Sequence, residues 1–115
     1  MQDKNRDLYL ISKIQKYCND IFEAHRLFDD CLDTFQNNSV YRNSIALCLL
    51  QIGELSIKLS DGFKETHTNI PWRAIRGMRN IVAHEYGHID EEVLWETSHI
   101  SIEKLQNFCQ SIITD

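Results

Sequence analysis

The chain has 115 residues, of which 43% are hydrophobic and 25% are charged, as in an ordinary globular domain. One proline and four glycines argue against a turn-rich β-sandwich, and no apolar run approaches the roughly 18 residues of a membrane span. The net charge of −5 argues against a nucleic-acid partner unless a local basic patch exists. We therefore expect one helical domain over residues 1–115.

Apolar residues recur at steps of three or four from about Asp3 to Leu27, which predicts a first long helix. The opening segment, MQDKNRDLYLISK, is charged and has no long apolar core, so we expect no signal peptide and a cytoplasmic location. His25 lies near the end of the predicted helix. We expect it to be half-buried or on the surface rather than a metal ligand.

A weaker pattern predicts a short helix near Asp29–Phe35, followed by the polar break QNNS. Ser39 is expected to cap a second long helix over about Val40–Leu59. Gly53 interrupts the apolar stripe of that helix. It either admits a closely packed neighbouring helix or has no particular role, and the sequence favours neither.

The segment SDGFKETHTNIP is expected to be a connection with one helical turn. A helix then follows from Pro71 to about Tyr86, with Asn69 as its cap and Gly87 as a left-handed residue that ends it. The last helix is expected from about Asp90 to Ile113. Together these elements predict an all-α fold, an antiparallel up-and-down bundle of four to five helices.

The four cysteines, at positions 18, 31, 48 and 109, form no C-x-x-C pair and fit no zinc template. Cys18, Cys48 and Cys109 lie in phase with apolar neighbours. We expect these three to be reduced thiols in the core.

Two motifs overlap in RNIVAHEYGH, residues 79–88. The first is His-Glu-x-x-His, in which His84 and His88 would bind zinc and Glu85 would act as the base. Gly87 interrupts it where the helix is expected to end, and a catalytic zinc ion needs a third protein ligand.

His99 or Glu103 could serve as that third ligand, but neither lies at a characteristic spacing. No strand is available to hold a peptide substrate. We therefore expect neither a metal ion nor another cofactor.

The second motif is Arg-x-x-x-x-His-x-Tyr, formed by Arg79, His84 and Tyr86, with Asn80 after the arginine. At 100° per residue Asn80 and His84 share a helix face, whereas Arg79 and His84 differ by about 140°. A joint site would need either a loosened helix end or a second copy of the chain across a twofold axis.

These side chains suit cleavage of RNA, which supplies its own 2′-OH nucleophile. The reaction needs proton transfer, which histidine performs near neutral pH, and positive charge at the phosphate, which arginine supplies. Arg73, Arg76 and Arg79 recur every three residues in a stretch without acidic residues, forming a local basic row. The alternative is structural, with Arg79 in a salt bridge and His84 at a helix end.

The segment IPWRAIRGMRNIVAHEYGHID resembles the signature of the HepT-like toxins, a branch of the HEPN superfamily. QIGELSIKLS is similar to the Ile-Gly-Glu segment in the second long helix of that family, and RDLYLISKIQKYCNDI resembles its first helix more loosely. The motif is matched in full by Arg79, His84 and Tyr86, and Asn80 is the polar residue that the family prefers after the arginine.

The resemblance implies a HEPN-like helical domain that forms a homodimer and acts as a metal-independent endoribonuclease toxin. It implies that Arg79 and His84 are catalytic and that Asn80 assists them. The usual antitoxin partner, a nucleotidyltransferase of the MntA type, would silence the toxin by transferring AMP to Tyr86. Glu54 matches the Ile-Gly-Glu segment, but the sequence gives it no chemical role.

A second hypothesis is a non-catalytic HEPN module that binds nucleotide or completes an assembly with a nucleotidyltransferase. In both hypotheses Arg73 and Arg76 are expected to bind phosphate groups. These belong to RNA in the first hypothesis and to a nucleotide in the second.

Overall fold

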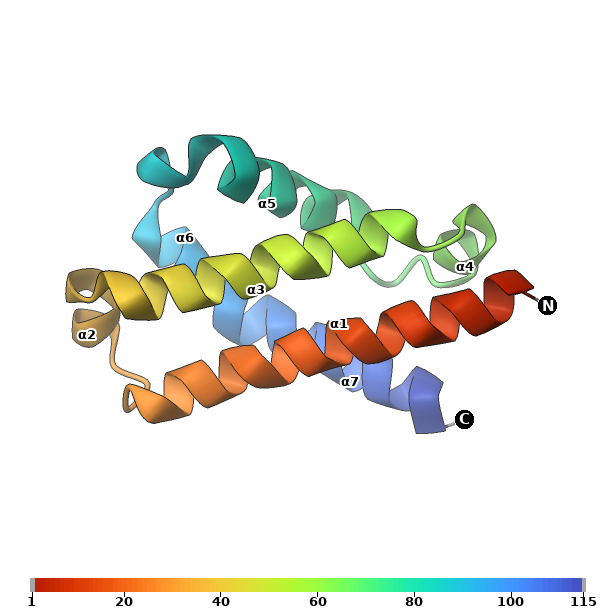
Figure 1. Cartoon of the computed structure of the whole chain (residues 1–115), viewed down its shortest axis with the longest axis horizontal. Coiled ribbons are helices and arrows are strands. Elements are labelled where there is room, and N and C mark those ends of the chain that lie inside the picture. The colour runs from red at the N-terminus through yellow and green to blue at the C-terminus, as the bar shows by residue number, and fades with distance from the viewer. Residues whose placement is uncertain (1, 115) are drawn as a thin grey trace.

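Helices make up nearly all of the computed structural model, which describes residues 2–114 (Figure 1). In chain order they are α1 (Gln2–Leu27), α2 (Leu32–Asn37), α3 (Ser39–Lys58), α4 (Asp61–Thr66), α5 (Trp72–Glu85), the 3₁₀ turn η1 (Tyr86–His88), α6 (Glu91–Glu96), the π-helical segment η2 (Thr97–Ser101) and α7 (Ile102–Thr114). The described residues include no strand, so the prediction of an all-α fold is confirmed. Among them, no helix combines the length and apolar character needed to cross a bilayer.

Four main helical rods alternate in direction, as expected for an up-and-down bundle. They are α1, α3, α5 and the run α6–η2–α7. α3 lies between α1 and α5, and the run α6–η2–α7 passes behind α3 and α1 in the view of Figure 1, with α7 packed along α1. α5 packs chiefly against α3. The third rod therefore lies at the edge of the bundle.

The core lies between α1, α3 and α7, where apolar side chains from the three helices are almost completely buried. Its centre is formed by Ile11, Ile14, Cys18, Ile21, Ile45, Leu49, Ile52, Ile102, Leu105 and Cys109. Cys18 and Cys109 are buried and Cys48 is half-buried, and all are free thiols. Burial raises the pKa of Cys48 to about 11 and that of Cys109 to about 12. The prediction of reduced core thiols is confirmed.

The segment between α1 and α3 differs from its prediction. Asp29 and Asp30 have positive φ angles, 59° and 49°, so the short helix cannot begin at Asp29 and starts three residues later. Asn38, not Ser39, caps α3, because its backbone is extended and its side-chain oxygen accepts a bond from the Tyr41 amide at 3.1 Å. The predicted cap was wrong by one residue.

Both predicted ends of the motif helix also need correction. Pro71 occupies the N-cap position of α5 without a side-chain bond, so Asn69 is not the cap. Gly87 does not adopt a left-handed conformation, because the chain continues from α5 into the η1 turn. A bond of 3.3 Å from the Ile89 amide to the Tyr86 carbonyl closes that turn. A 3₁₀ turn therefore replaces the predicted glycine stop.

His25 is buried, with 5% of its surface exposed, so the prediction of a half-buried or surface histidine was wrong. Its two ring nitrogens contact the Tyr41 hydroxyl and, at 3.0 Å, the Ser98 hydroxyl. These partners satisfy the ring inside the bundle. Burial lowers the pKa of His25 to about 4, assisted by nearby His99 and opposed by the Asp30 carboxylate.

We expect the free energy of unfolding to fall by about 2 kcal/mol between pH 7 and pH 5 because of His25. The unfolded chain binds a proton at this residue below its ordinary pKa of about 6.5, whereas the native chain resists protonation until about pH 4. Denaturant titrations at the two pH values measure the loss. In His25→Gln this contribution should disappear; an unchanged pH dependence in that variant would contradict the assignment.

Candidate active site

α5 buries one side and exposes the other. Val82 is buried and Ile75 and Met78 are partly buried against the core, as their spacing predicts. The polar residues of the motif region point elsewhere: Arg73, Arg76, Asn80 and His84 are exposed. The packing of α5 therefore places both the basic row and the motif histidine on accessible surface.

Gly53 sets the separation of α3 and α5 at the motif. A Cβ atom added at Gly53 would lie 2.3 Å from the Cβ of Arg79, closer than real side chains approach. Only glycine therefore fits between the two helices at this point. Of the two alternatives for Gly53, the structure supports close approach of a neighbouring helix.

The close approach brings Arg79 to Glu54, the residue after that glycine. The Arg79 Nε atom donates to Glu54 Oε1 at 2.5 Å, and the Nη2 atom of Arg79 is also 2.5 Å from that oxygen. The Nη1 atom donates to Asn80 Oδ1 at 3.0 Å. Glu54 thus acquires the role that the sequence could not give it, because it fixes the guanidinium beside Asn80. In the sequence, the Gly53–Glu54 pair was the feature that could have indicated this contact.

Tyr86 lies in η1 and donates a hydrogen bond from its hydroxyl to Asn43 Oδ1 on α3. Its side chain is 39% exposed. Asn43 lies 43 residues away along the chain, and nothing in its sequence surroundings indicated this contact. Tyr86 is therefore partly exposed, and α3 orients its hydroxyl group.

His84 occupies the last turn of α5 and is exposed, whereas His88 lies beyond Glu85 in the 3₁₀ turn. The two histidines of the zinc motif are therefore not on one continuous α-helix. Within residues 2–114, the side chains grouped closely enough to hold a metal ion are His25, Asp30 and His99, which include neither motif histidine.

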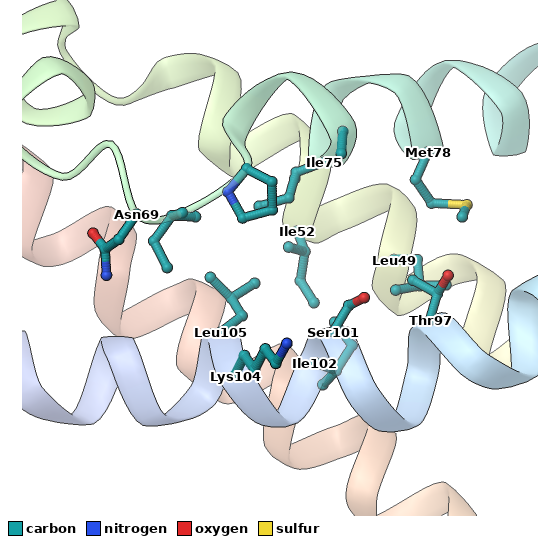
Figure 2. Close-up of a pocket in the computed structure, with 13 residues that line it drawn as sticks. Leu49, Ile52, Asn69, Ile75, Met78, Thr97, Ser101, Ile102, Lys104 and Leu105 are labelled. Carbon is teal, nitrogen blue, oxygen red and sulfur yellow. The ribbon is translucent and has the colours of Figure 1, made fainter.

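An apolar groove of about 390 Å³ runs between α5 and the rod opposite it (Figure 2). Ile75 and Met78 line it from α5, Leu49 and Ile52 from α3, and Leu105 from α7. The groove involves the first half of α5 and not the half that carries His84. The groove therefore lies next to the motif and contains none of the motif side chains.

A second cavity, of about 200 Å³, lies where α3, α4 and α5 meet. Arg73, Arg76 and Lys64 all line it, next to Trp72. Lys64 was not identified from the sequence, because the contact joins two helices. The three cations give the basic row a concave surface that suits a phosphate group.

The antiparallel bundle, with a Gly-Glu segment on α3 facing the Arg-x-x-x-x-His-x-Tyr motif on α5, defines a HEPN-like helical domain. The profile of the family described as "Ribonuclease HepT-like" matches residues 11–112. The chain belongs to this family and is therefore a ribonuclease by class.

Several curated proteins are similar over most of their length. "Putative RNase MJ1380" of Methanocaldococcus jannaschii is 32% identical over 81% of this chain and 84% of its own. "Probable ribonuclease HepT" of Thermococcus cleftensis is 33% identical over 78% and 86%, respectively. "Putative RNase TTE0752" of Caldanaerobacter subterraneus subsp. tengcongensis is 31% identical over 80% and 82%. No solved structure matches the chain significantly.

Proposed function

We propose that this chain is an endoribonuclease toxin that cleaves RNA without a metal ion, through Arg79 and His84 with help from Asn80. The observation that carries the proposal is the position of the Arg79 guanidinium, which Glu54 and Asn80 hold in place. The exposed His84 imidazole follows about one and a half helical turns later. Membership of the HepT-like ribonuclease family supports the enzyme class.

In the proposed reaction the ribose 2′-oxygen attacks the adjacent phosphorus while a neutral imidazole of His84 takes its proton. The bond from phosphorus to the 5′-oxygen breaks, and that oxygen receives a proton from a second, protonated imidazole. Arg79 stabilises the additional negative charge on the phosphoryl oxygens. Asn80 keeps the guanidinium in place through its side-chain oxygen.

The second imidazole would come from a second copy of the chain. Exposed apolar residues adjoin the motif: Val40 is 67% exposed, Leu47 56% and Ile81 40%. On α3, Val40 and Leu47 share a face with Asn43, the partner of Tyr86. A twofold-related copy that covers this patch would bring two motifs together. We therefore propose a homodimer whose cleft contains both copies of Arg79 and His84.

The direct test is cleavage of a single-stranded RNA by the purified chain in excess EDTA. Cleavage should persist, because none of the proposed steps uses an ion. Activity that chelation abolishes and added divalent ions restore, while circular dichroism shows the protein still folded in EDTA, would refute the mechanism. Arg73, Arg76 and Lys64 are proposed to bind flanking phosphates; their substitution should weaken RNA binding more than it lowers the rate at saturating RNA.

We also propose that the partner is a nucleotidyltransferase antitoxin of the MntA type, which transfers AMP from ATP to Tyr86. The partial exposure of Tyr86 supports this assignment. An adenylyl group would break the bond to Asn43 and place a negative charge beside the position proposed for the RNA phosphate.

Coexpression with such a partner should add about 329 Da to the intact mass for each adenylyl group transferred. The addition should be absent in Tyr86→Phe, which keeps the ring and loses the hydroxyl, and present in the control Tyr9→Phe on α1. Intact-mass spectrometry measures both. An addition that persists in Tyr86→Phe would place the modification elsewhere.

One observation favours a second candidate function, a non-catalytic module. The Glu54 carboxylate neutralises the Arg79 guanidinium, and the chain as a whole is acidic. Such a module would bind the partner and nucleotide phosphates through the basic row. Expression without the partner would then be tolerated by cells, whereas a ribonuclease toxin would arrest growth.

A further inference from the structure

A cluster of polar side chains unrelated to the motif lies between the end of α1, the turn that follows it and η2. His25 comes from the last turn of α1, Asp30 from the turn after it, and His99 from η2. One ligand atom from each lies within 4.8 Å of the others. Residues about 70 positions apart thus converge on one point.

The hydrogen-bond partners of His25 determine which ring nitrogen carries the hydrogen. The Ser98 hydroxyl donates to the Trp95 carbonyl at 2.7 Å and must therefore accept from His25 Nε2 at 3.0 Å. His25 Nδ1 is left with a lone pair, which accepts a hydrogen bond from the Tyr41 hydroxyl. The Nδ1 atom lies 3.8 Å from Asp30 Oδ1.

The same reasoning applies to His99. Its Nδ1 atom lies 2.8 Å from the Trp95 carbonyl oxygen, which can only accept, so Nδ1 carries a hydrogen. Its Nε2 atom lies 2.5 Å from Asp30 Oδ1, which as a carboxylate also only accepts. A positive bridge is needed between Nε2 and the carboxylate, either a second proton or a metal ion.

We propose that His25 Nδ1, Asp30 Oδ1 and His99 Nε2 form a binding site for a divalent transition-metal ion of the Zn²⁺ type. Two imidazoles and a carboxylate are a donor set that such ions favour. Each histidine donates its other N–H to a protein oxygen, the usual second layer around a metal-bound imidazole.

To hold an ion, the ligand atoms, which lie within 4.8 Å of one another, must adjust their spacing, and the Tyr41 hydroxyl must turn away from His25 Nδ1. Bonds of about 2.0–2.1 Å in tetrahedral geometry place ligand atoms about 3.3 Å apart. The two separations from Asp30 Oδ1, 2.5 Å to His99 and 3.8 Å to His25, lie on either side of that value. Asp30 and His99 have side chains 59% and 30% exposed, so an ion can enter and a water molecule can complete its coordination.

Two local backbone distortions meet at this site. Asp29 and Asp30 both adopt left-handed conformations, which few residue types other than glycine, asparagine and aspartate adopt. The π-helical segment Thr97–Ser101 departs from the α-helix where it presents Ser98 and His99 to His25. Such distortions concentrate at functional sites. The open depression over the cluster also contains Glu103 and Arg26, and Arg26 is paired with Glu23.

The ion would connect the end of α1 to the last helical rod, so its expected effect is on stability. Titration of the chelator-treated protein with Co²⁺ should give visible d–d absorption that saturates at one ion per chain and is displaced by Zn²⁺. Free Zn²⁺ at about 100 times Kd should raise the melting temperature by roughly 10 °C.

The variants His99→Gln and Asp30→Asn should each weaken binding by about 100-fold or more. Asp30 is exposed, so its variant tests the site even if His99→Gln is misfolded, as circular dichroism would reveal. His88→Gln, in the unrelated zinc motif, is the matched control and should bind normally. The proposal is overturned if no ion binds at millimolar concentration, or if binding survives both site variants or fails in His88→Gln. Ribonuclease activity in EDTA is a separate measurement and is unaffected by either outcome.

Discussion

His84→Ala is expected to lower RNA cleavage by about 10²–10⁴-fold, the usual contribution of a general acid or base. The imidazole is exposed and lies outside the core, so its removal should leave the fold intact. Single-turnover cleavage of a labelled RNA at saturating protein measures the chemical step. Arg79→Ala should cost about 10²–10³-fold through loss of charge stabilisation at the phosphorus.

His88→Ala is the matched control for His84→Ala. It removes an exposed imidazole four residues away, in the η1 turn, and should retain nearly full activity. Equal losses in the two histidine variants would indicate that the His-Glu-x-x-His pattern matters after all. Full activity in His84→Ala would remove the proposed role altogether.

Mixing the unaltered chain with the inactive His84→Ala chain tests the composite site. The proposed reaction needs the His84 imidazoles of both copies, so a dimer with one altered chain should be inactive. Random exchange of equal amounts should therefore leave about a quarter of the normal activity, since only a quarter of the dimers have two unaltered chains. Half of the normal activity after subunit exchange would place a complete site on one chain.

Gly53→Ala is expected to destabilise the chain by about 3 kcal/mol, at the upper end of the cost of overpacking. The added methyl group would lie 2.3 Å from Arg79 Cβ, an atom fixed to the backbone, so α5 would have to move away from α3. The Arg79–Glu54 pair would then separate and RNA cleavage should fall as well. Chemical denaturation and the cleavage assay measure the two effects.

Gly77→Ala supplies the control for that prediction. Gly77 also lies within a helix, but a Cβ atom there would meet nothing within 4 Å. The substitution should stabilise the chain by about 0.5–1 kcal/mol, because alanine is the better helix former. Gly53→Ala behaving like Gly77→Ala would contradict the close approach of the two helices.

Local periodicity predicted the helices well, because the apolar stripes of α1, α3 and α7 depend on residues three or four positions apart. The bounds of the first and last rods lie within one residue of their predictions. Some errors concern the ends of helices, where cap and turn geometry differ from the prediction. The error at His25 concerns contacts between distant segments. His25 was misplaced because Tyr41 and Ser98 satisfy its ring, and no local pattern pairs these residues.

The residues of the candidate site likewise fall into those that the sequence identified and those that it did not. The motif and the basic row were visible because they lie on α5 and in the η1 turn that directly follows it. Glu54 and Asn43 contribute from α3, and Lys64 from α4. Their proximity to α5 arises from tertiary packing and from Gly53, so spacing along the chain could not supply it.

α5 lies at the edge of the bundle and packs chiefly against α3. The candidate site on α5 can therefore lose its order without unfolding of the core. A segment supported on one side opens locally at a lower free energy than the whole molecule. Amides of α5 should therefore exchange with deuterium sooner than those of α1. A ligand that stabilises or destabilises this single helix would change the activity of the enzyme gradually, while the hydrophobic core remains folded.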